Sequence, residues 1–152
     1  MNIDRSLIGC ELPPVAVTVE EQGIRRFAAA IGEADPLYAE RSVAAARGYR
    51  ALPAPPTYVF CLKTAVAFPG DILKSLGIDQ ESAVLLHAEQ AFTYYGPICA
   101  GDRITFRERI ADIYEKKGGA LVFVVTRTVA ANQLGEQVAE ITYTEAVRPH
   151  RS

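Results

Sequence analysis

The second half of the sequence consists of four long segments in which polar and apolar residues alternate. Alternation with a period of two indicates β-strands, because successive side chains of a strand point to opposite faces of a sheet. Short segments with glycine or proline separate them, which predicts a four-strand antiparallel meander. The four segments are AVLLHAEQAFTYY (83–95), DRITFRERIADIYEKK (102–117), ALVFVVTRTVAAN (120–132) and EQVAEITYTEAV (136–147).

The middle two segments indicate how the sheet is buried. In residues 102–117 apolar residues alternate mainly with arginines, which is typical of a strand with one face in water. The run LVFVV (121–125) is apolar on both faces, so it is expected at the centre of the sheet or under an oligomer contact. Between them, Gly118-Gly119 is predicted to form a two-residue hairpin turn, since both glycines tolerate positive φ.

The first half shows the spacing of helices. Apolar residues at positions 24, 27, 28 and 31 follow an i, i+3, i+4, i+7 pattern, which predicts a helix from about residue 20 to 31. Gly32 is expected to cap its C-terminus, and Pro36 disfavours helix in the residues before it, so GEADPLY (32–38) is a loop. Val15–Val19, after two prolines, is predicted to be an edge strand, and a short helix is expected at about 40–47.

The segment TYVFCLKTAVAF (57–68) is apolar nearly all the way round, with Lys63 and Thr64 as the main polar interruptions. Such a helix belongs inside a protein. Thr57 follows a proline-rich stretch and is placed to act as its N-cap. The order of elements predicts an α+β fold, in which one antiparallel sheet curls around a single buried helix, with residues 1–152 as one domain.

Composition narrows the classes of function. The chain has 152 residues, a formal charge of −2 and no basic block, which argues against nucleic acid or a membrane surface as a partner. Its three cysteines are far apart, so neither a disulfide framework nor a metal site is expected, and a cytoplasmic location fits best. Hydrophobic residues make up 49% of the chain, which favours an oligomer.

Three motifs in this order resemble those of the MaoC-like hydratases and dehydratases, the (R)-specific enoyl-CoA hydratase family. The family loop Gly-Asp-x-Asn-Pro-x-His corresponds to GEADPLY, the stretch APPT precedes the apolar helix, and HAEQAFTYYGPICAGDRI is similar to the strand, proline turn and Ala-Gly-Asp that follow. The resemblance covers nearly the whole chain and is strongest to the N-terminal, FAS1-like dehydratase branch. It implies a hot-dog fold and a homodimer or a heteromer with another hot-dog subunit, with continuous sheets and a pocket between protomers.

The resemblance also implies a reaction, the syn addition or removal of water across the α,β bond of an acyl thioester. The family's Asp and His hold the water, and backbone N–H groups at the start of the buried helix stabilise the developing enolate. Here Glu33 stands at the aspartate position and Tyr38 at the histidine position, while Asp35 replaces the asparagine. A histidine exchanges protons near neutral pH, whereas tyrosine, with a pKa of about 10, does so only if strongly perturbed.

Glu33, Asp35 and Tyr38 are therefore the candidate catalytic residues. Each has a structural alternative: a solvated carboxylate after a helix end, a turn cap and a packed hydroxyl, respectively. Candidate substrate-binding residues are Pro56, Thr57, Tyr58 and His87. Of these, only Thr57 and Tyr58 offer a backbone N–H as an oxyanion donor, and His87 has the alternative of an ordinary strand histidine.

Other charged residues carry weaker hypotheses. Arg103, Arg107 and Arg109 form a basic strand face that is either a phosphate contact or simply solvated. Glu108 and Glu145 lie on mainly apolar strand faces and are expected at strand ends that reach solvent. No cofactor is expected beyond the coenzyme A or phosphopantetheine of the substrate.

Four functions remain open. The first is a hydratase or dehydratase subunit that shapes the acyl-thioester pocket while a partner hot-dog supplies the Asp–His pair. The second is a self-sufficient dehydratase using the Glu33, Asp35 and Tyr38 side chains. The others are an acyl-CoA thioesterase on the same fold and a non-catalytic acyl-thioester-binding module.

Overall fold

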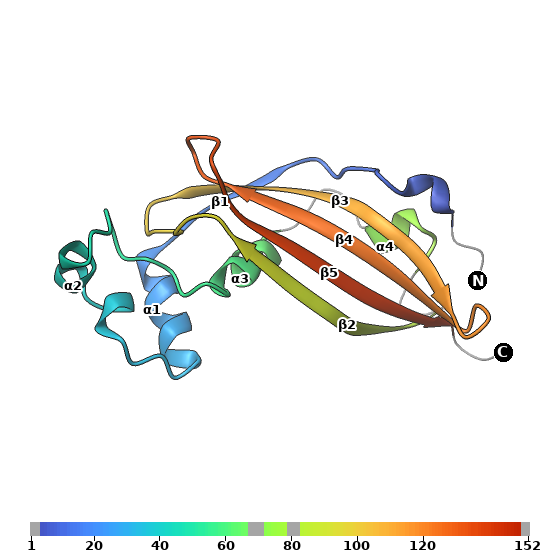
Figure 1. Cartoon of the computed structure of the whole chain (residues 1–152), viewed down its shortest axis with the longest axis horizontal. Helices are drawn as coiled ribbons and strands as arrows, with labels where there is room; N and C mark the ends of the chain where they lie inside the picture. Colours follow the sequence, from blue (N-terminus) through green and yellow to red (C-terminus); the bar gives the residue numbers. More distant parts are fainter. Residues whose placement is uncertain (1–3, 67–71, 79–82, 150–152) are drawn as a thin grey trace.

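The computed structural model describes residues 4–66, 72–78 and 83–149, and its largest element is a five-stranded antiparallel sheet (Figure 1). The strand order is β1-β3-β4-β5-β2, so β4, which contains LVFVV, lies at the centre as predicted. β1 is short and lies at an edge, also as predicted. The strands are β1 (Val15–Thr18), β2 (Ala83–Tyr94), β3 (Arg103–Lys116), β4 (Leu121–Ala131) and β5 (Gln137–Pro149).

The predicted four-strand meander is wrong for β2. Strands β3, β4 and β5 follow one another as antiparallel neighbours, but β2 pairs with β5 at the far edge of the sheet. The other side of β3 is occupied by β1 and by the N-terminal segment, where the Leu12 N–H donates to the Glu108 carbonyl at 2.9 Å. Alternation fixes the face that a side chain takes, but it leaves the neighbouring strand undetermined.

The β3–β4 hairpin also differs from the prediction. Lys116 pairs with Leu121, so the loop has four residues, 117–120, instead of two. Lys117, Gly118 and Gly119 all take positive φ, at 53°, 63° and 87°. The two glycines supply the left-handed backbone that the prediction required, and the lysine before them extends the loop.

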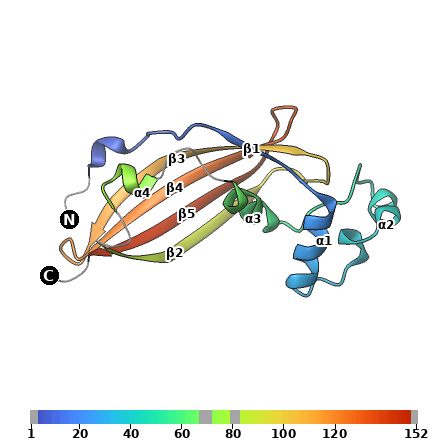
Figure 2. The same ribbon diagram turned by 180° about the vertical axis from the view of Figure 1, so that it is seen from behind.

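The helices lie at one end of the sheet and across one of its faces. Figure 1 shows α1 and α2 beyond the ends of the strands, and Figure 2, from behind, shows α3 and α4 in front of the sheet. Among the helices of the described segments, none is long and apolar enough to span a membrane. Their bounds are α1 (Glu21–Ala30), α2 (Arg41–Ala46), α3 (Tyr58–Ala65) and α4 (Ile72–Ser75), with 3₁₀ turns η1 (Arg5–Leu7) and η2 (Pro36–Tyr38).

The apolar helix α3 is shorter than the predicted 57–68. Val66 leaves the helical conformation with φ −101° and ψ 134°, and positions 67 and 68 lie outside the described residues. Val59 and Leu62 are buried, whereas Thr64 and Ala65 are exposed. The predicted α+β arrangement, a curled antiparallel sheet packed on a central helix, is confirmed, but one side of that helix remains open in the single chain.

Two apolar clusters fill the concave face of the sheet. The first, called the α3 cluster, joins α1 and α3 to the sheet through residues such as Ile24, Leu62 and Phe106. The second, called the α4 cluster, joins Ile72 and Leu76 to the other half of the same strands. The buried core is therefore divided along the length of the strands.

Candidate functional site

The loop GEADPLY begins where α1 ends. Gly32 takes φ +73°, and the Glu33 N–H donates to the Ala28 carbonyl at 2.9 Å, which closes the last turn of the helix. A left-handed glycine after a helix satisfies terminal carbonyls at little steric cost. The predicted cap is therefore confirmed, and it directs the following residues back toward α2.

Both carboxylates of this loop accept hydrogen bonds from the loop itself. Glu33 is exposed, and its Oε1 accepts from the Asp35 N–H at 2.9 Å. Asp35 caps η2, accepting from the Leu37 N–H at 2.9 Å and from Arg47 Nη1 at 2.8 Å. The Arg47 hydrogen bond, followed by the Leu37 N–H, lowers the pKa of Asp35. Two carboxylates that could act as bases are thus engaged in fixing the loop.

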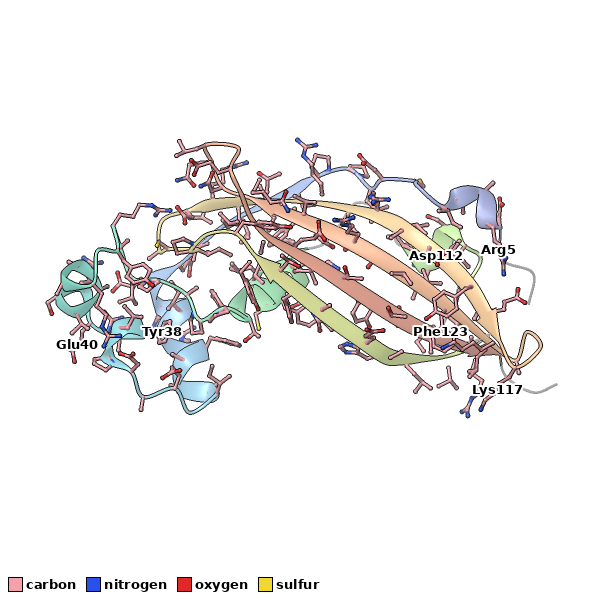
Figure 3. All side chains as sticks on the ribbon, viewed as in Figure 1. Arg5, Tyr38, Glu40, Asp112, Lys117 and Phe123 are labelled. Carbon is pink, nitrogen blue, oxygen red and sulfur yellow. The ribbon has the colours of Figure 1, made fainter. Side chains whose placement is uncertain are left out.

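Tyr38 at the end of η2 is half-buried and lies at the helical end of the molecule (Figure 3). Burial, and next the negative charge of Glu33, raise the pKa of its hydroxyl. A phenol with a raised pKa remains protonated at neutral pH, so it donates a hydrogen bond but does not take a proton from water. Tyr38 is suited to orient a ligand and unsuited to the role of general base.

Tyr38 lines a cleft of about 310 Å³ beside the start of α3. The cleft brings together two of the candidate site residues, Tyr38 and Pro56, from the loop and from the APPT stretch. Glu33, Asp35 and His87 are not among its lining residues. Its walls are mainly aromatic rings and prolines: Tyr38, Tyr49, Pro53, Ala54, Pro55, Pro56, Tyr94, Gly96, Pro97 and Ile98.

Apart from Tyr38 and Pro56, the residues that line the cleft were not among the predicted site residues, and three of them show why. Tyr49 follows α2, Tyr94 ends β2, and Pro97 lies in the turn after β2. The YYGP stretch does signal a strand end followed by a turn, but nothing in the sequence indicates that this turn returns to the start of α3. The isolated bridge between Pro53 and Cys99 makes that connection.

Of the two predicted oxyanion donors at the start of α3, one is already used within the turn. The Tyr58 N–H donates to the Pro55 carbonyl at 2.9 Å, so it is used within the turn. The Thr57 N–H has no acceptor among the described residues, and Pro55 and Pro56 have no N–H at all. Of the two proposed oxyanion donors, Thr57 is the one that the geometry leaves available.

The Tyr58 side chain packs against α1 and does not line the cleft. Its ring lies 5.1 Å from that of Phe27, and a Cβ added at Gly23 would lie 2.2 Å from its hydroxyl oxygen. Gly23, in the first turn of α1, therefore makes room for this tyrosine, which packs α3 against α1.

This contact gives a test of the α1–α3 packing. Alanine in place of glycine normally stabilises a helix by about 0.5–1 kcal/mol, but Gly23→Ala is expected to destabilise the protein by about 1–2 kcal/mol, because Tyr58 must move. In a Tyr58→Phe background the next nearest atom, Cζ, is 3.4 Å away, so the same change should become stabilising. Urea unfolding of the four proteins measures the reversal, and its absence would contradict the packing argument.

Asp102, in the AGD stretch, is a buried residue whose role was not predicted. Its carboxylate accepts from the Cys99 N–H at 2.7 Å, from Arg50 Nη2 at 2.5 Å and from Gln133 Nε2 at 3.1 Å. Only 1% of the residue is exposed. It therefore joins the turn before β3 to the segment ahead of α3 and to the β4–β5 loop, and it supports the cleft from outside.

Removal of the Asp102 carboxylate should lower the stability of the protein. Asp102→Ala leaves a buried N–H and two side-chain donors without their acceptor, so we expect a loss of about 3 kcal/mol in the free energy of unfolding. Asp112→Ala is the matched control, because Asp112 is exposed and, within the described part of the chain, accepts only from the neighbouring Ile113 N–H. This change should cost about 1 kcal/mol or less. Equal losses measured by chemical denaturation would contradict the assigned role.

His87 lies far along β2, where its ring packs on Tyr143 at a centroid distance of 4.7 Å. The arginines Arg103 and Arg107 are exposed on the convex face of the sheet, opposite α3 and the cleft. The described part of the chain contains no cluster of three or more His, Cys, Asp or Glu side chains able to hold a metal ion.

The expectation that Glu108 lies at a strand end in solvent is wrong. Glu108 is in the middle of β3, only 8% exposed, and forms an ion pair with Lys63 of α3. It also accepts a hydrogen bond from Thr128 Oγ1 at 2.7 Å. Lys63, which interrupts the apolar helix, thus faces the sheet, and its charge is compensated inside the protein.

Comparison with known proteins now assigns the family. A family model described as FAS1-like, dehydratase domain region, matches residues 6–141. The chain belongs to this family. A UPF0336 protein of Streptomyces coelicolor is 36% identical over 141 residues, covering 91% of this chain and 90% of that protein. A UPF0336 protein of Mycobacterium tuberculosis is 32% identical over 122 residues, covering 80% and 71%.

Solved structures agree with this FAS1-like dehydratase assignment. A chain of the HadBC (3R)-hydroxyacyl-ACP dehydratase complex of Mycobacterium tuberculosis is 29% identical, with a TM-score of 0.79 over 92% of this chain and 96% of that one. The (R)-hydratase PhaJ1 of Pseudomonas aeruginosa, at 20% identity and a TM-score of 0.67, covers 95% of this chain and 83% of its own. It shares the fold, which is the hot-dog fold predicted from the sequence.

Proposed function

We propose that this chain is the substrate-shaping subunit of a hydratase or dehydratase that acts on acyl thioesters of coenzyme A or a carrier protein. The observation that carries the proposal is Tyr38. It occupies the position of the family histidine in the cleft beside α3, but as a protonated phenol it cannot serve as the base. A second hot-dog subunit with an intact Asp–His pair then supplies the proton transfer.

Each part of the cleft has a role in this scheme. The aromatic and proline walls surround the acyl chain near the thioester, and Tyr38 donates a hydrogen bond to the bound substrate or to the water. In this scheme the Thr57 N–H, at the positive end of α3 and without an acceptor among the described residues, donates to the thioester oxygen. The partner's carboxylate and imidazole add or remove water across the α,β bond.

The free edge of β2 supports pairing with another hot-dog. Among the described residues, β2 has no neighbouring strand on its outer side, and several of its residues are exposed, including Leu86 at 46% and Tyr94 at 45%. An exposed and partly apolar edge strand is a template for another chain. HadBC and ChsH1–ChsH2, both of Mycobacterium tuberculosis, are complexes that each contain a chain of this fold, the latter at 20% identity and a TM-score of 0.75.

A self-sufficient dehydratase using Glu33 or Asp35 is less well supported, because both carboxylates accept hydrogen bonds from their own loop.

The deciding experiment purifies the chain alone and with a hot-dog subunit encoded beside it, then follows crotonyl-CoA hydration and the mass of the assembly. The complex is expected to be at least a heterodimer, and the isolated chain should show no more than about 1% of its rate. Strong activity of the isolated chain that survives Tyr38→Phe would overturn the proposal.

A further inference from the structure

A second cavity, of about 530 Å³, lies beside the cleft and has charged walls. Tyr49 lines both the cleft and this cavity. Its charged lining residues are Glu21 of α1, Arg41 of α2, and Arg50, whereas the described residues that line the cleft carry no charge. Its volume is within the range of about 300–1,000 Å³ that is usual for small-molecule sites. We call it the arginine cavity.

Two backbone segments connect the cleft to the arginine cavity. Residues 49–56 and 96–101 run side by side, held by hydrogen bonds such as that from the Ala54 N–H to the Ile98 carbonyl at 2.8 Å. One end of this pair of segments lines the arginine cavity, and the other end lines the cleft. A molecule bound in the cleft therefore has a continuous wall along which the rest of it can extend into the arginine cavity.

The arginine cavity lies on the side of the sheet away from β2. Gly101, one of its lining residues, donates its N–H to the carbonyl of Val19 at 2.8 Å, directly after β1. β1 and β2 are the two edges of the five-stranded sheet. Pairing of a partner along β2 therefore does not use the strand edge beside this cavity.

Both arginines are held by a carboxylate and keep unused donors. Arg41 binds Glu21 Oε2 through Nε at 2.8 Å and Nη2 at 2.6 Å. Arg50 Nη2 binds the buried Asp102 carboxylate at 2.5 Å. Within the described residues, Nη1 of Arg41 and both Nε and Nη1 of Arg50 have no acceptor. Glu21 also pairs with Arg25 at 2.7 Å, so its charge is compensated without Arg41.

Two fixed arginines with unused donors in one cavity favour an anionic ligand. A guanidinium group can bind phosphate through two parallel hydrogen bonds, and such charge-assisted bonds are about twice as strong as neutral ones. The proposed substrate carries a phosphate of its own. Its acyl group is joined through the thioester to a pantetheine arm, and this arm ends in a phosphate in both coenzyme A and carrier proteins.

We infer that the arginine cavity binds the phosphate of the substrate's phosphopantetheine arm through Arg41 and Arg50. The inference rests on the proposed function and adds a second task for this subunit, recognition of the group that carries the acyl chain. The acyl group then lies in the uncharged cleft, and the arm passes Tyr49 on its way to the arginines.

Isothermal titration calorimetry of the purified full chain, in the oligomer that it forms, tests this inference. Crotonyl-4′-phosphopantetheine should bind about 10-fold more tightly than crotonyl-pantetheine, which lacks only the phosphate. Arg41→Gln should reduce this ratio to about threefold or less, because it removes one guanidinium. Arg25→Gln is the matched control, since Arg25 pairs with the same Glu21 carboxylate but is not a lining residue, and it should leave the ratio within about twofold.

A second pair of variants tests the cavity without removing an arginine. Ala45 and Ala46 are both exposed residues of α2, but only Ala45 lines the arginine cavity. Ala45→Glu places a carboxylate where the phosphate is expected, so the ratio should fall to near one. Ala46→Glu adds the same charge outside the cavity and should leave the ratio within about twofold.

A ratio near one in the original protein, or a ratio that neither Arg41→Gln nor Ala45→Glu lowers, would overturn the inference. Once the ratio responds to both variants, crotonyl-CoA and a crotonyl-carrier protein identify the source of the phosphate. Whichever of the two is weakened by Arg41→Gln is a carrier that the cavity recognises.

Crotonyl-CoA hydration by the complex with the hot-dog partner decides the proposed function separately. If the complex hydrates crotonyl-CoA while the phosphate gives no preference, only the inference fails. If the Arg41-dependent preference is present and the complex shows no hydration, only the proposed function fails.

Discussion

In a complex of this chain with a catalytic hot-dog partner, replacing the histidine of the partner's Gly-Asp-x-Asn-Pro-x-His loop by glutamine is expected to lower kcat at least about 10²-fold. Tyr38→Phe in the present chain should change kcat by less than about threefold, because it removes one hydrogen bond and no proton carrier. Steady-state rates of crotonyl-CoA hydration give kcat for both variants.

The difference between these two expected effects on kcat follows from the protonation states of the partner's histidine and of Tyr38. Burial and the nearby Glu33 raise the pKa of Tyr38, so its phenolate is rare near neutral pH. Tyr38→Ala, which enlarges the cleft, should instead raise KM several-fold with little change in kcat, because it removes binding surface that serves ground state and transition state alike. Tyr95→Phe is the control, since Tyr95 is 57% exposed and lies outside the cleft. A loss of 10²-fold in Tyr38→Phe would assign the chemistry to this chain.

The strands were predictable from the sequence because their alternation is long and regular. β3 and β4 begin and end within one residue of the segments read from the pattern, and their buried faces agree with it. The place of β2 was not predictable, because pairing with β5 depends on the N-terminal segment already covering β3. That segment has little alternation of its own.

The candidate site was predictable only in part. GEADPLY could be placed at the end of α1 from Gly32 and Pro36 alone, and Tyr38 and Pro56 do line one cleft. The packing of Tyr58 on Gly23 was not predictable, since a helix start says nothing about which helix its side chains meet. The ion pair between Lys63 and Glu108 was not predictable either. The two residues are 45 positions apart, and the sequence pattern around each one does not indicate that the other is its partner.

The ion pair between Lys63 and Glu108 carries the largest expected effect on stability. Both side chains are about 90% buried, at 11% and 10% exposed, and Thr128 donates a further hydrogen bond to the carboxylate. Lys63→Met keeps the volume and helix propensity but leaves a buried charge without its partner. Breaking such a pair typically costs about 3–5 kcal/mol, and this is the loss expected in the free energy of unfolding.

Removing both charges should restore most of that stability. In Lys63→Met/Glu108→Leu the remaining cost is mainly the unpaired Thr128 hydroxyl, so we expect a loss of about 1–2 kcal/mol relative to the original protein. Lys117→Met, at the exposed β3–β4 hairpin (Figure 3), controls for the substitution itself and should stay within about 0.5 kcal/mol. Urea denaturation of the four proteins gives the values. If the double variant were no more stable than Lys63→Met, the cost would lie in lost packing of α3, whereas recovery would show that the charge pair fixes this helix over β3.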